Sequence, residues 1–192
     1  SSGKMASAIA DELARRGAEV TVVSGPAAVR PSEPGVRIVD VVSARQMYEA
    51  TVAEYDKGSD ITVLCAAVAD FTPASPSTSK IKKDGERMEL TLVPTEDIAA
   101  AIGSRRRQDG VVAGFALETD NAEDNAVSKL RRKNMDMIVL NSLRDPGAGF
   151  GTDTNKVTFF FRNGDSQSLP LESKADVAAA LVDRLERLLG QC

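Results

Sequence analysis

Lysine side chains are the groups in this 192-residue sequence best suited to act on an anionic substrate, because the chain contains no histidine. The lack of histidine excludes Ser-His-Asp hydrolysis, His-Glu-x-x-His zinc chemistry and imidazole proton transfer. Lys80, Lys82 and Lys83 form one cationic cluster, and Lys129 and Lys133 lie one turn apart on a predicted helix. These ammonium groups could neutralise an anion. The plainer interpretations are a solvated surface cluster and compensation of a helix dipole.

Small residues, a carboxylate and an aromatic ring follow predicted strands. After the apolar run that ends at Cys65, Ala66-Ala67 would let a ring or ribose approach the backbone, and Asp70 could bind a hydroxyl or a cation. Phe115 ends a later strand and could face a base. The N–H groups of the helix that starts at Ser1-Ser2-Gly3-Lys4 favour a phosphate. A capping aspartate, a core-edge phenylalanine and a flexible start are the structural alternatives. Together these features favour a site for a polyphosphate nucleotide.

Strands and helices are predicted to alternate along the chain. Helices are expected at 3–16, 43–57, 95–106, 121–134 and 173–189, and strands at 18–24, 36–42, 60–67, 111–115 and 136–140. This order predicts an α/β fold: a Rossmann-like, three-layer, mostly parallel sheet with helices on both faces. Its ligand crevice would lie at the carboxyl ends of the strands, where the residues above are expected.

Two β-hairpins interrupt this alternation. One is predicted over 80–93, where Met88, Leu90 and Leu92 alternate around a turn at Asp84-Gly85. The other is predicted over 156–171, with its turn at Asn163-Gly164, and leads into the last amphipathic helix. Both hairpins are insertions into an otherwise regular α/β pattern.

Length and composition indicate a single domain over residues 1–192, since 42% hydrophobic positions suffice for one core. The positions of Cys65 and Cys192 suggest neither a disulfide nor a metal site, so we expect a cytoplasmic setting. No run approaches the roughly 18 apolar residues of a membrane helix. The net charge of -4, with both signs interspersed, argues against a nucleic-acid partner.

Several longer motifs occur in a fixed order along nearly the whole chain. They are SSGKM at 1–5, AAVADF at 66–71, KIKK at 80–83, GFALET at 114–119, RRKNMDMIVLN at 131–141 and GAGFGTDTNKV at 147–157. In this order they resemble phosphopantothenoylcysteine synthetase, the ligase domain of the bacterial bifunctional coenzyme A biosynthesis protein. The resemblance implies that 4'-phosphopantothenate is joined to L-cysteine at the expense of CTP, through an acyl-cytidylate and with Mg²⁺. It also implies a homodimer, and it leaves open whether a flavin-dependent decarboxylase domain precedes residue 1.

The resemblance assigns roles to individual residues. Ser2 and Gly3 would hold phosphates, and Lys80 would be the catalytic lysine of a lid over 72–93. The residues implied to contact the nucleotide are Cys65, Ala66, Ala67, Asp70, Lys80, Glu96, Asp97, Ile98, Ala99, Phe115, Lys129 and Lys133. No metal ligand is implied by name.

The sequence departs from the family pattern at a few points. Thr95-Glu96 replaces the more usual Asn-Pro, and Ala6 stands where glycine is usual. The family's first strand, its Gly-Gly-Thr loop and an asparagine implicated in acyl-cytidylate formation precede SSGKM and are not in this sequence. We therefore expect residues 1–192 alone to be poorly active.

Two other functions compete with the ligase. A nicotinamide-dependent short-chain oxidoreductase would need a Gly-x-Gly-x-x-Gly motif and Tyr-x-x-x-Lys, and neither Tyr48 nor Tyr55 has such a lysine. A Rossmann-like dimerisation module without activity is the second alternative. In that module the C-terminal hairpin would pair with a second chain, because an exposed apolar strand over 157–161 would be a liability. The preference for CTP over ATP stays open.

Overall fold

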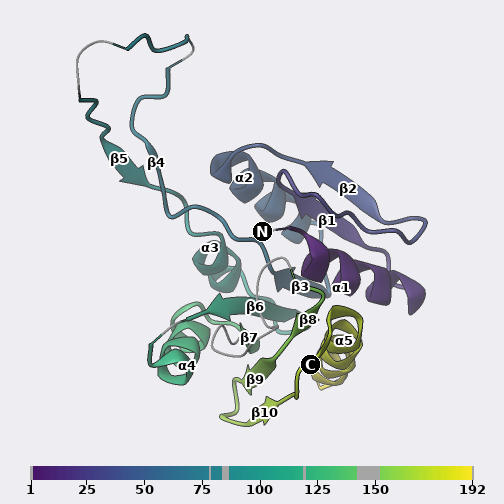
Figure 1. Ribbon diagram of the computed structural model, residues 1–192. Coiled ribbons are helices and arrows are strands. Elements are labelled where there is room, and N and C mark those ends of the chain that lie inside the picture. The colour runs from purple at the N-terminus through teal and green to yellow at the C-terminus, as the bar shows by residue number, and fades with distance from the viewer. Residues whose placement is uncertain (1, 78, 84–86, 119, 142–151, 192) are drawn as a thin grey trace.

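A five-stranded sheet forms the centre of the computed structural model, which describes residues 2–77, 79–83, 87–118, 120–141 and 152–191 (Figure 1). Its strands, in spatial order, are β10 (Ser166–Ser168), β9 (Val157–Phe161), β7 (Met137–Asn141), β6 (Val111–Leu117) and β3 (Ile61–Leu64). Strands β3, β6 and β7 are parallel, whereas β9 and β10 are antiparallel to their neighbours. The predicted α/β fold with a mostly parallel central sheet is confirmed.

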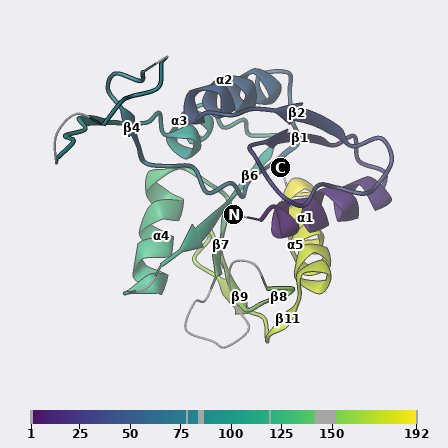
Figure 2. The ribbon, with the colours of Figure 1, turned by 45° about the horizontal axis from the view of Figure 1, so that its top comes forward.

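Helices cover both faces of this sheet, as predicted (Figure 2). On one face lie α1 (Lys4–Arg15) and α5 (Lys174–Leu189); on the other lie α2 (Ala44–Tyr55), α3 (Ile98–Ser104) and α4 (Ala122–Arg132). Successive side chains of each strand point to opposite faces of the sheet, so each strand contributes residues to both cores. Met137 and Val139 belong to the α1–α5 core, and Ile138 and Leu140 belong to the opposite core.

The first two strands, β1 (Thr21–Ser24) and β2 (Arg37–Asp40), form a separate parallel pair. They were expected to belong to one continuous sheet, and that expectation is wrong for the described residues. Strand β3 is consequently an edge of the central sheet, and its residues are only half-buried despite their apolar types. Its side chains nevertheless contact both cores, with Ile61 and Val63 on the α1–α5 side and Leu64 on the opposite side.

The first predicted hairpin has a different pairing from the one expected. Strand β4 (Phe71–Pro73) pairs antiparallel with β5 (Leu92–Pro94), and residues 79–83 and 87–91 contain no strand. The predicted turn at Asp84-Gly85 lies outside the described residues. Residues 71–94, except 78 and 84–86, form an arm that projects from the body of the molecule (Figure 1). Alternation at Met88 and Leu90 suggested a strand, but a lone hairpin without a surface to pack against is marginally stable.

The C-terminal hairpin is confirmed. Gly164 adopts φ 97° and donates its N–H to the Phe161 carbonyl at 3.0 Å, which closes the predicted turn. The short strands β8 (Thr154–Asn155) and β11 (Glu172–Ser173) pair beside it, and the Ser173 hydroxyl caps α5. Strand β9 lies between β7 and β10, so its apolar residues are not an exposed edge, and the pairing of this hairpin with a second chain stays a prediction. The edge strand on this side of the sheet is β10, whose residues are exposed.

Candidate functional site

The carboxyl ends of β3 and β6 bring together several residues predicted to bind the nucleotide. Leu64 is the register partner of Gly114, so Cys65 and Phe115 follow side by side, and both pack against the α1–α5 core. Ala66 and Ala67 are exposed directly after β3, and Phe115 is half-buried. An exposed small-residue backbone beside an aromatic ring is a suitable surface for a flat heterocycle.

Cys65 itself offers no nucleophile. Burial raises the pKa of its thiol to about 12, so the sulfur stays protonated near neutral pH. A contact from the backbone of this position to the nucleotide stays a prediction.

The first turn of α1 presents a helix N-terminus to the same edge. Gly3 occupies the N-cap with φ 85°, and no side chain caps the helix. A Cβ atom at Gly3 would lie 2.4 Å from the Val29 carbonyl oxygen, so only glycine fits here. The Ser2 carbonyl also accepts a hydrogen bond from the Val29 N–H at 3.0 Å. The loop before β2 thus fixes the Ser2-Gly3 turn in a conformation suited to a phosphate.

Lys174, a cation that the sequence did not single out, lies near this turn together with Lys4. Lys4 pairs with Asp153 at 2.6 Å, and Lys174 donates to the Thr154 carbonyl at 3.2 Å. Burial lowers the pKa of Lys174, and the charge of Lys4 acts in the same direction. Both lysines line a shallow hollow of about 400 Å³ together with Ser7, Ala8, Asp11, Val29, Arg30, Ser32 and Asp153. The α1 terminus therefore lies beside two ammonium groups, one of which is paired with Asp153.

Asp97 caps α3, although the sequence put the start of this helix at Thr95. Its Oδ1 accepts the Ala100 N–H at 2.9 Å. The Thr95 hydroxyl instead donates to the Ala69 carbonyl at 2.7 Å, and the Thr95 N–H donates to the Asp70 carbonyl at 3.0 Å. Thr95 thus fastens the segment containing Asp70 to the start of α3. Glu96 is exposed before this helix, and Ile98 and Ala99 are half-buried in its first turn; all belong to the predicted set.

Lys133 lies where the end of α4 packs against α3. Its ammonium forms an ion pair with Asp97, and its side chain is only 13% exposed. The Lys133 carbonyl packs against Gly103 of α3, where a Cβ atom would come within 1.8 Å of the oxygen. Asn134, at φ 50°, donates Nδ2 to the Gly103 carbonyl at 2.8 Å. Lys133 and Asp97 are thereby positioned together, with Lys129 half-buried one turn earlier on α4.

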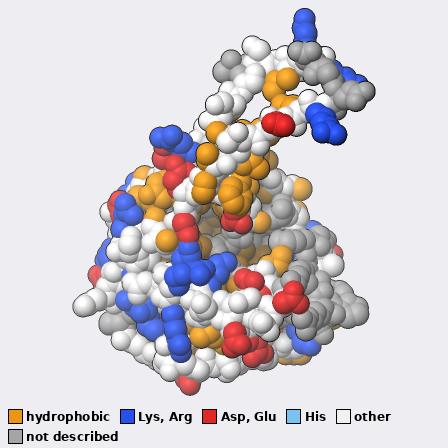
Figure 3. All heavy atoms as spheres, turned by 90° about the vertical axis from the view of Figure 1, so that its left-hand side faces the viewer, with side chains coloured by type: hydrophobic (Ala, Val, Ile, Leu, Met, Phe, Trp, Pro, Cys, Tyr) orange, Lys and Arg blue, Asp and Glu red, His pale blue; other side chains and the backbone are white. Residues whose placement is uncertain are grey.

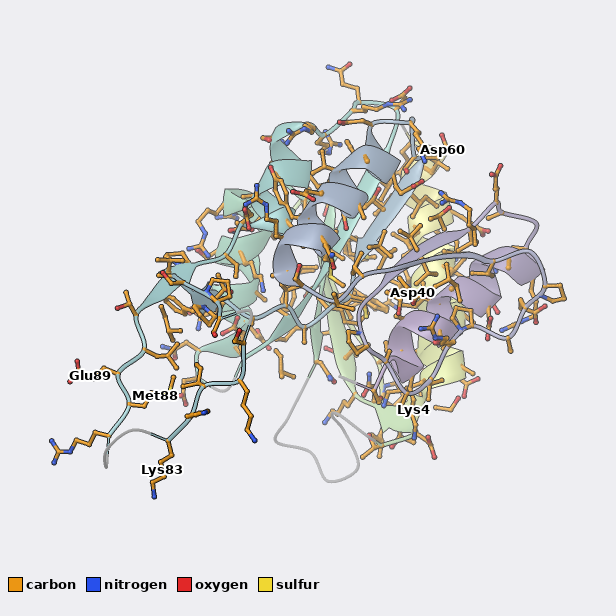
Figure 4. All side chains as sticks on the ribbon, turned by 90° about the horizontal axis from the view of Figure 1, so that it is seen from above. Lys4, Asp40, Asp60, Lys83, Met88 and Glu89 are labelled. Atoms are coloured by element: carbon orange, nitrogen blue, oxygen red, sulfur yellow. The ribbon has the colours of Figure 1, made fainter. Side chains whose placement is uncertain are left out.

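The arm lysines lie apart from these residues. Figure 4 shows Lys83, Met88 and Glu89 on the far part of the arm, well away from Lys4 at α1. Lys80 belongs to this exposed stretch of the arm. Figure 3 shows other lysine and arginine side chains on the face beneath the arm. Of the predicted cations, Lys133 reaches the start of α3 through its ion pair with Asp97, whereas Lys80 lies apart on the arm.

Comparisons with known proteins bear on what this site does. Residues 1–189 match the family described as the DNA/pantothenate metabolism flavoprotein C-terminal domain. The chain belongs to this family. It is 40% identical over 191 residues to the coenzyme A biosynthesis bifunctional protein CoaBC of Bacillus subtilis, covering 100% of this chain and 47% of that protein. It is 48% identical over 189 residues to a cysteine/cysteine sulfinic acid decarboxylase of an unknown prokaryote, covering 98% of this chain and 52% of that protein.

The fold of the family is also shared. The crystal structure of the C-terminal domain of a CoaBC protein superposes with a TM-score of 0.82 at 38% identity, covering 100% of this chain and 87% of that one. The predicted resemblance to the ligase domain of the bifunctional coenzyme A biosynthesis protein is confirmed. The chain spans about half the length of the curated relatives that it matches.

Two further observations concern metals and membranes. Within the described ranges, no group of three or more cysteine, aspartate, glutamate or histidine side chains is placed to hold a metal ion. In the same part of the chain, no helix is long and apolar enough to cross a membrane.

Proposed function

We propose that this chain is the domain that joins 4'-phosphopantothenate to L-cysteine in coenzyme A biosynthesis. CTP would activate the pantothenate carboxylate as an acyl-cytidylate with loss of pyrophosphate, and the cysteine amine would then displace CMP. The observation that carries this proposal is the match to the CoaBC C-terminal domain over the whole chain. It is supported by the convergence of Cys65, Phe115 and the α1 N-terminus on one edge of the sheet.

The nucleotide would lie across the ends of β3 and β6. Its base would face Phe115 and the backbone of Cys65-Ala66-Ala67, and Asp70 would accept hydrogen bonds from hydroxyl groups. Ser2 and Gly3 would bind phosphate at the helix terminus. The segment Glu96-Asp97-Ile98-Ala99, with Lys129 and Lys133, would complete the nucleotide site.

The reaction needs charge neutralisation more than proton transfer. A carboxylate that attacks an α-phosphate brings two anions together, and fixed ammonium groups such as Lys133 stabilise that arrangement. Mg²⁺ would enter with the triphosphate, because this ion commonly binds through substrate phosphates and few protein carboxylates. An acyl-phosphate anhydride is reactive enough for an amine to open it without a histidine base.

The arm would act as the lid over 72–93, with Lys80 closing over the intermediate. Phe71, Ile81, Met88, Leu90 and Leu92 are each more than half exposed on this arm. Apolar side chains on a projecting segment favour burial by another surface. We therefore propose a homodimer in which the arm is covered by a second copy. This arrangement would also bring Lys80 close to a site, whether its own or the partner's.

The relatives suggest the wider setting. The B. subtilis relative is named as a bifunctional protein, so we propose a flavin-dependent decarboxylase domain as the neighbour of this chain. The cytoplasmic setting expected from the sequence stays a prediction.

Nucleotide-dependent thermal stability tests this function against its alternatives. The complete protein is melted with CTP and Mg²⁺, with ATP and Mg²⁺, and with NAD(P). At about 100 times the Kd, a bound nucleotide stabilises a protein by about 2.7 kcal/mol. Stabilisation by CTP supports the ligase, and stabilisation by NAD(P) alone would favour an oxidoreductase. Indifference to every nucleotide would favour a dimerisation module.

A further inference from the structure

Asn141 ends β7 with an unsatisfied polar group. Asn141 is buried, with only 8% of its surface exposed. Among the described residues, its Oδ1 is the buried side-chain oxygen or nitrogen that has no hydrogen-bond partner. Buried polar atoms in native proteins nearly always have partners, and an exception calls for a cause.

The position of Asn141 on the sheet places this amide on the α1 side of the ligand edge. Side chains alternate along β7, so Asn141 shares a face with Met137 and Val139, which belong to the α1–α5 core. Its register partners are Leu117 of β6 and Val157 of β9. The same alternation on β6 and β3 puts Phe115 and Cys65 on this face.

The first turn of α1 lies against the same part of the sheet. Met5 of α1 and Val157 belong to one core cluster, and Val157 is directly opposite Asn141. Asn155, two residues before Val157, donates Nδ2 to the Met5 sulfur at 3.5 Å. The uncapped N-terminus of α1 and the unsatisfied amide of Asn141 therefore lie at one end of the sheet, on one face.

These two features complement each other chemically. A helix N-terminus without a capping side chain binds an anion, with a phosphate as the usual occupant. An amide oxygen binds a hydrogen-bond donor, which the phosphate lacks but a neighbouring hydroxyl supplies. A ligand with a phosphoryl group and a nearby hydroxyl would satisfy both.

We propose that Asn141 is a further substrate-binding residue, whose amide oxygen accepts a hydrogen bond from a hydroxyl of the phosphorylated substrate seated at the first turn of α1. The inference rests on the proposed function. CTP through its ribose and 4'-phosphopantothenate through its secondary hydroxyl both carry this chemistry. Neither the sequence motifs nor the family resemblance assigned a role to this residue.

The test separates binding from folding with two matched variants of the complete protein. Asn141→Leu removes the amide with little change of size, and Asn155→Leu removes a buried amide that has a partner. The Kd for CTP with Mg²⁺ and the KM for 4'-phosphopantothenate are measured, along with the Tm without substrate. Asn141→Leu should weaken one of the two substrates about tenfold, the effect of one lost hydrogen bond of about 1.4 kcal/mol. The Tm of this variant should stay the same or rise, because the unsatisfied group is gone. Asn155→Leu should lower the Tm.

The two substrate measurements identify the source of the hydroxyl: a weaker CTP Kd assigns it to the ribose, and a higher KM for 4'-phosphopantothenate assigns it to that substrate. If Asn141→Leu changes both values less than twofold while the wild type forms product, the role of Asn141 is overturned and the proposed function stands. A Tm that falls as far as that of Asn155→Leu, with unchanged substrate values, assigns Asn141 a structural role and also overturns the proposal. If Asn141→Leu does not fold, Asn141→Ser is measured by the same criteria.

Discussion

Replacement of Gly103 by alanine should damage both the fold and the proposed nucleotide site. In an ordinary helix this substitution is stabilising by about 0.5–1 kcal/mol, because glycine loses more backbone entropy on folding. At Gly103 the new Cβ atom would lie 1.8 Å from the Lys133 carbonyl oxygen and 2.8 Å from its carbon. Helix α3 and the end of α4 would have to separate by about 1.5 Å to restore van der Waals contact. Because Gly103 is fully packed between them, neither side can yield without a backbone shift.

The magnitude follows from the contacts that this shift disturbs. Overpacking a well-packed interior costs about 1–3 kcal/mol, and loss of the hydrogen bond from Asn134 to Gly103 costs about 1 kcal/mol more. After subtraction of the helix-propensity gain, Gly103→Ala should lower the free energy of unfolding by about 2–3 kcal/mol. For a protein of this size the Tm should fall by about 5–10 °C. The shift also separates Lys133 from Asp97, so CTP should bind more weakly.

Gly190→Ala provides a matched control. Gly190 ends α5 with φ -69°, and a Cβ atom there would lie 3.5 Å from the Glu186 carbonyl oxygen, an ordinary contact. Urea unfolding followed by circular dichroism gives both free energies, and isothermal titration gives CTP affinity. Gly190→Ala should be neutral or slightly stabilising. Equal stability of Gly103→Ala and Gly190→Ala would refute the close packing of α3 on α4.

Three further predictions concern a buried carboxylate, a surface carboxylate and the arm. Asp136 is 6% exposed and accepts hydrogen bonds from Arg106. Asp136→Ala should lower the free energy of unfolding, measured in urea, by about 3–5 kcal/mol, and a loss below 1 kcal/mol would contradict the burial of this carboxylate. Lys57 and other cations hold the pKa of Glu54 below its ordinary 4.5, so its stabilisation is present at neutral pH and is lost as the pH falls through the lowered value. Glu54→Gln should therefore flatten stability against pH in that range, and a curve parallel to the wild type would argue against the pairing. Lys80→Ala should lower turnover by at least about 100-fold with an unchanged Tm; near-normal turnover would exclude the lid role.

Periodic patterns in the sequence predicted most of the fold. Helices α1, α2, α4 and α5 and the hairpin at Gly164 lie where spacing and turn residues indicate, because local sequence decides those features. The cap of α3 could not be chosen from sequence. Thr95 and Asp97 are both good capping residues, and a tertiary bond from Thr95 to the Ala69 carbonyl decides between them.

The errors have a common physical cause. Alternation of Met88, Leu90 and Leu92 reports a β-like pattern, but whether a strand forms depends on a surface that local sequence does not specify. The split between β1–β2 and the central sheet is likewise a matter of tertiary pairing.

The site was predictable in part. Residues at the ends of β3 and β6 could be located because parallel strands present their carboxyl ends to one edge. Lys174 and Asn141 carry no sequence signal, since their importance lies in burial and in the presence or lack of partners. The arm lysines were expected at the site from their clustering and from the family resemblance, and the relation of Lys80 to the site stays a prediction.

Product stoichiometry tests the ligase proposal most directly. The complete protein is incubated with 4'-phosphopantothenate, L-cysteine, CTP and Mg²⁺, and the coupled amide, pyrophosphate and CMP are quantified by mass spectrometry and chromatography. We expect one pyrophosphate and one CMP for each amide formed, with no amide when the nucleotide is omitted. Amide formation accompanied by CDP and inorganic phosphate, or intact CTP with no amide at all, would contradict it.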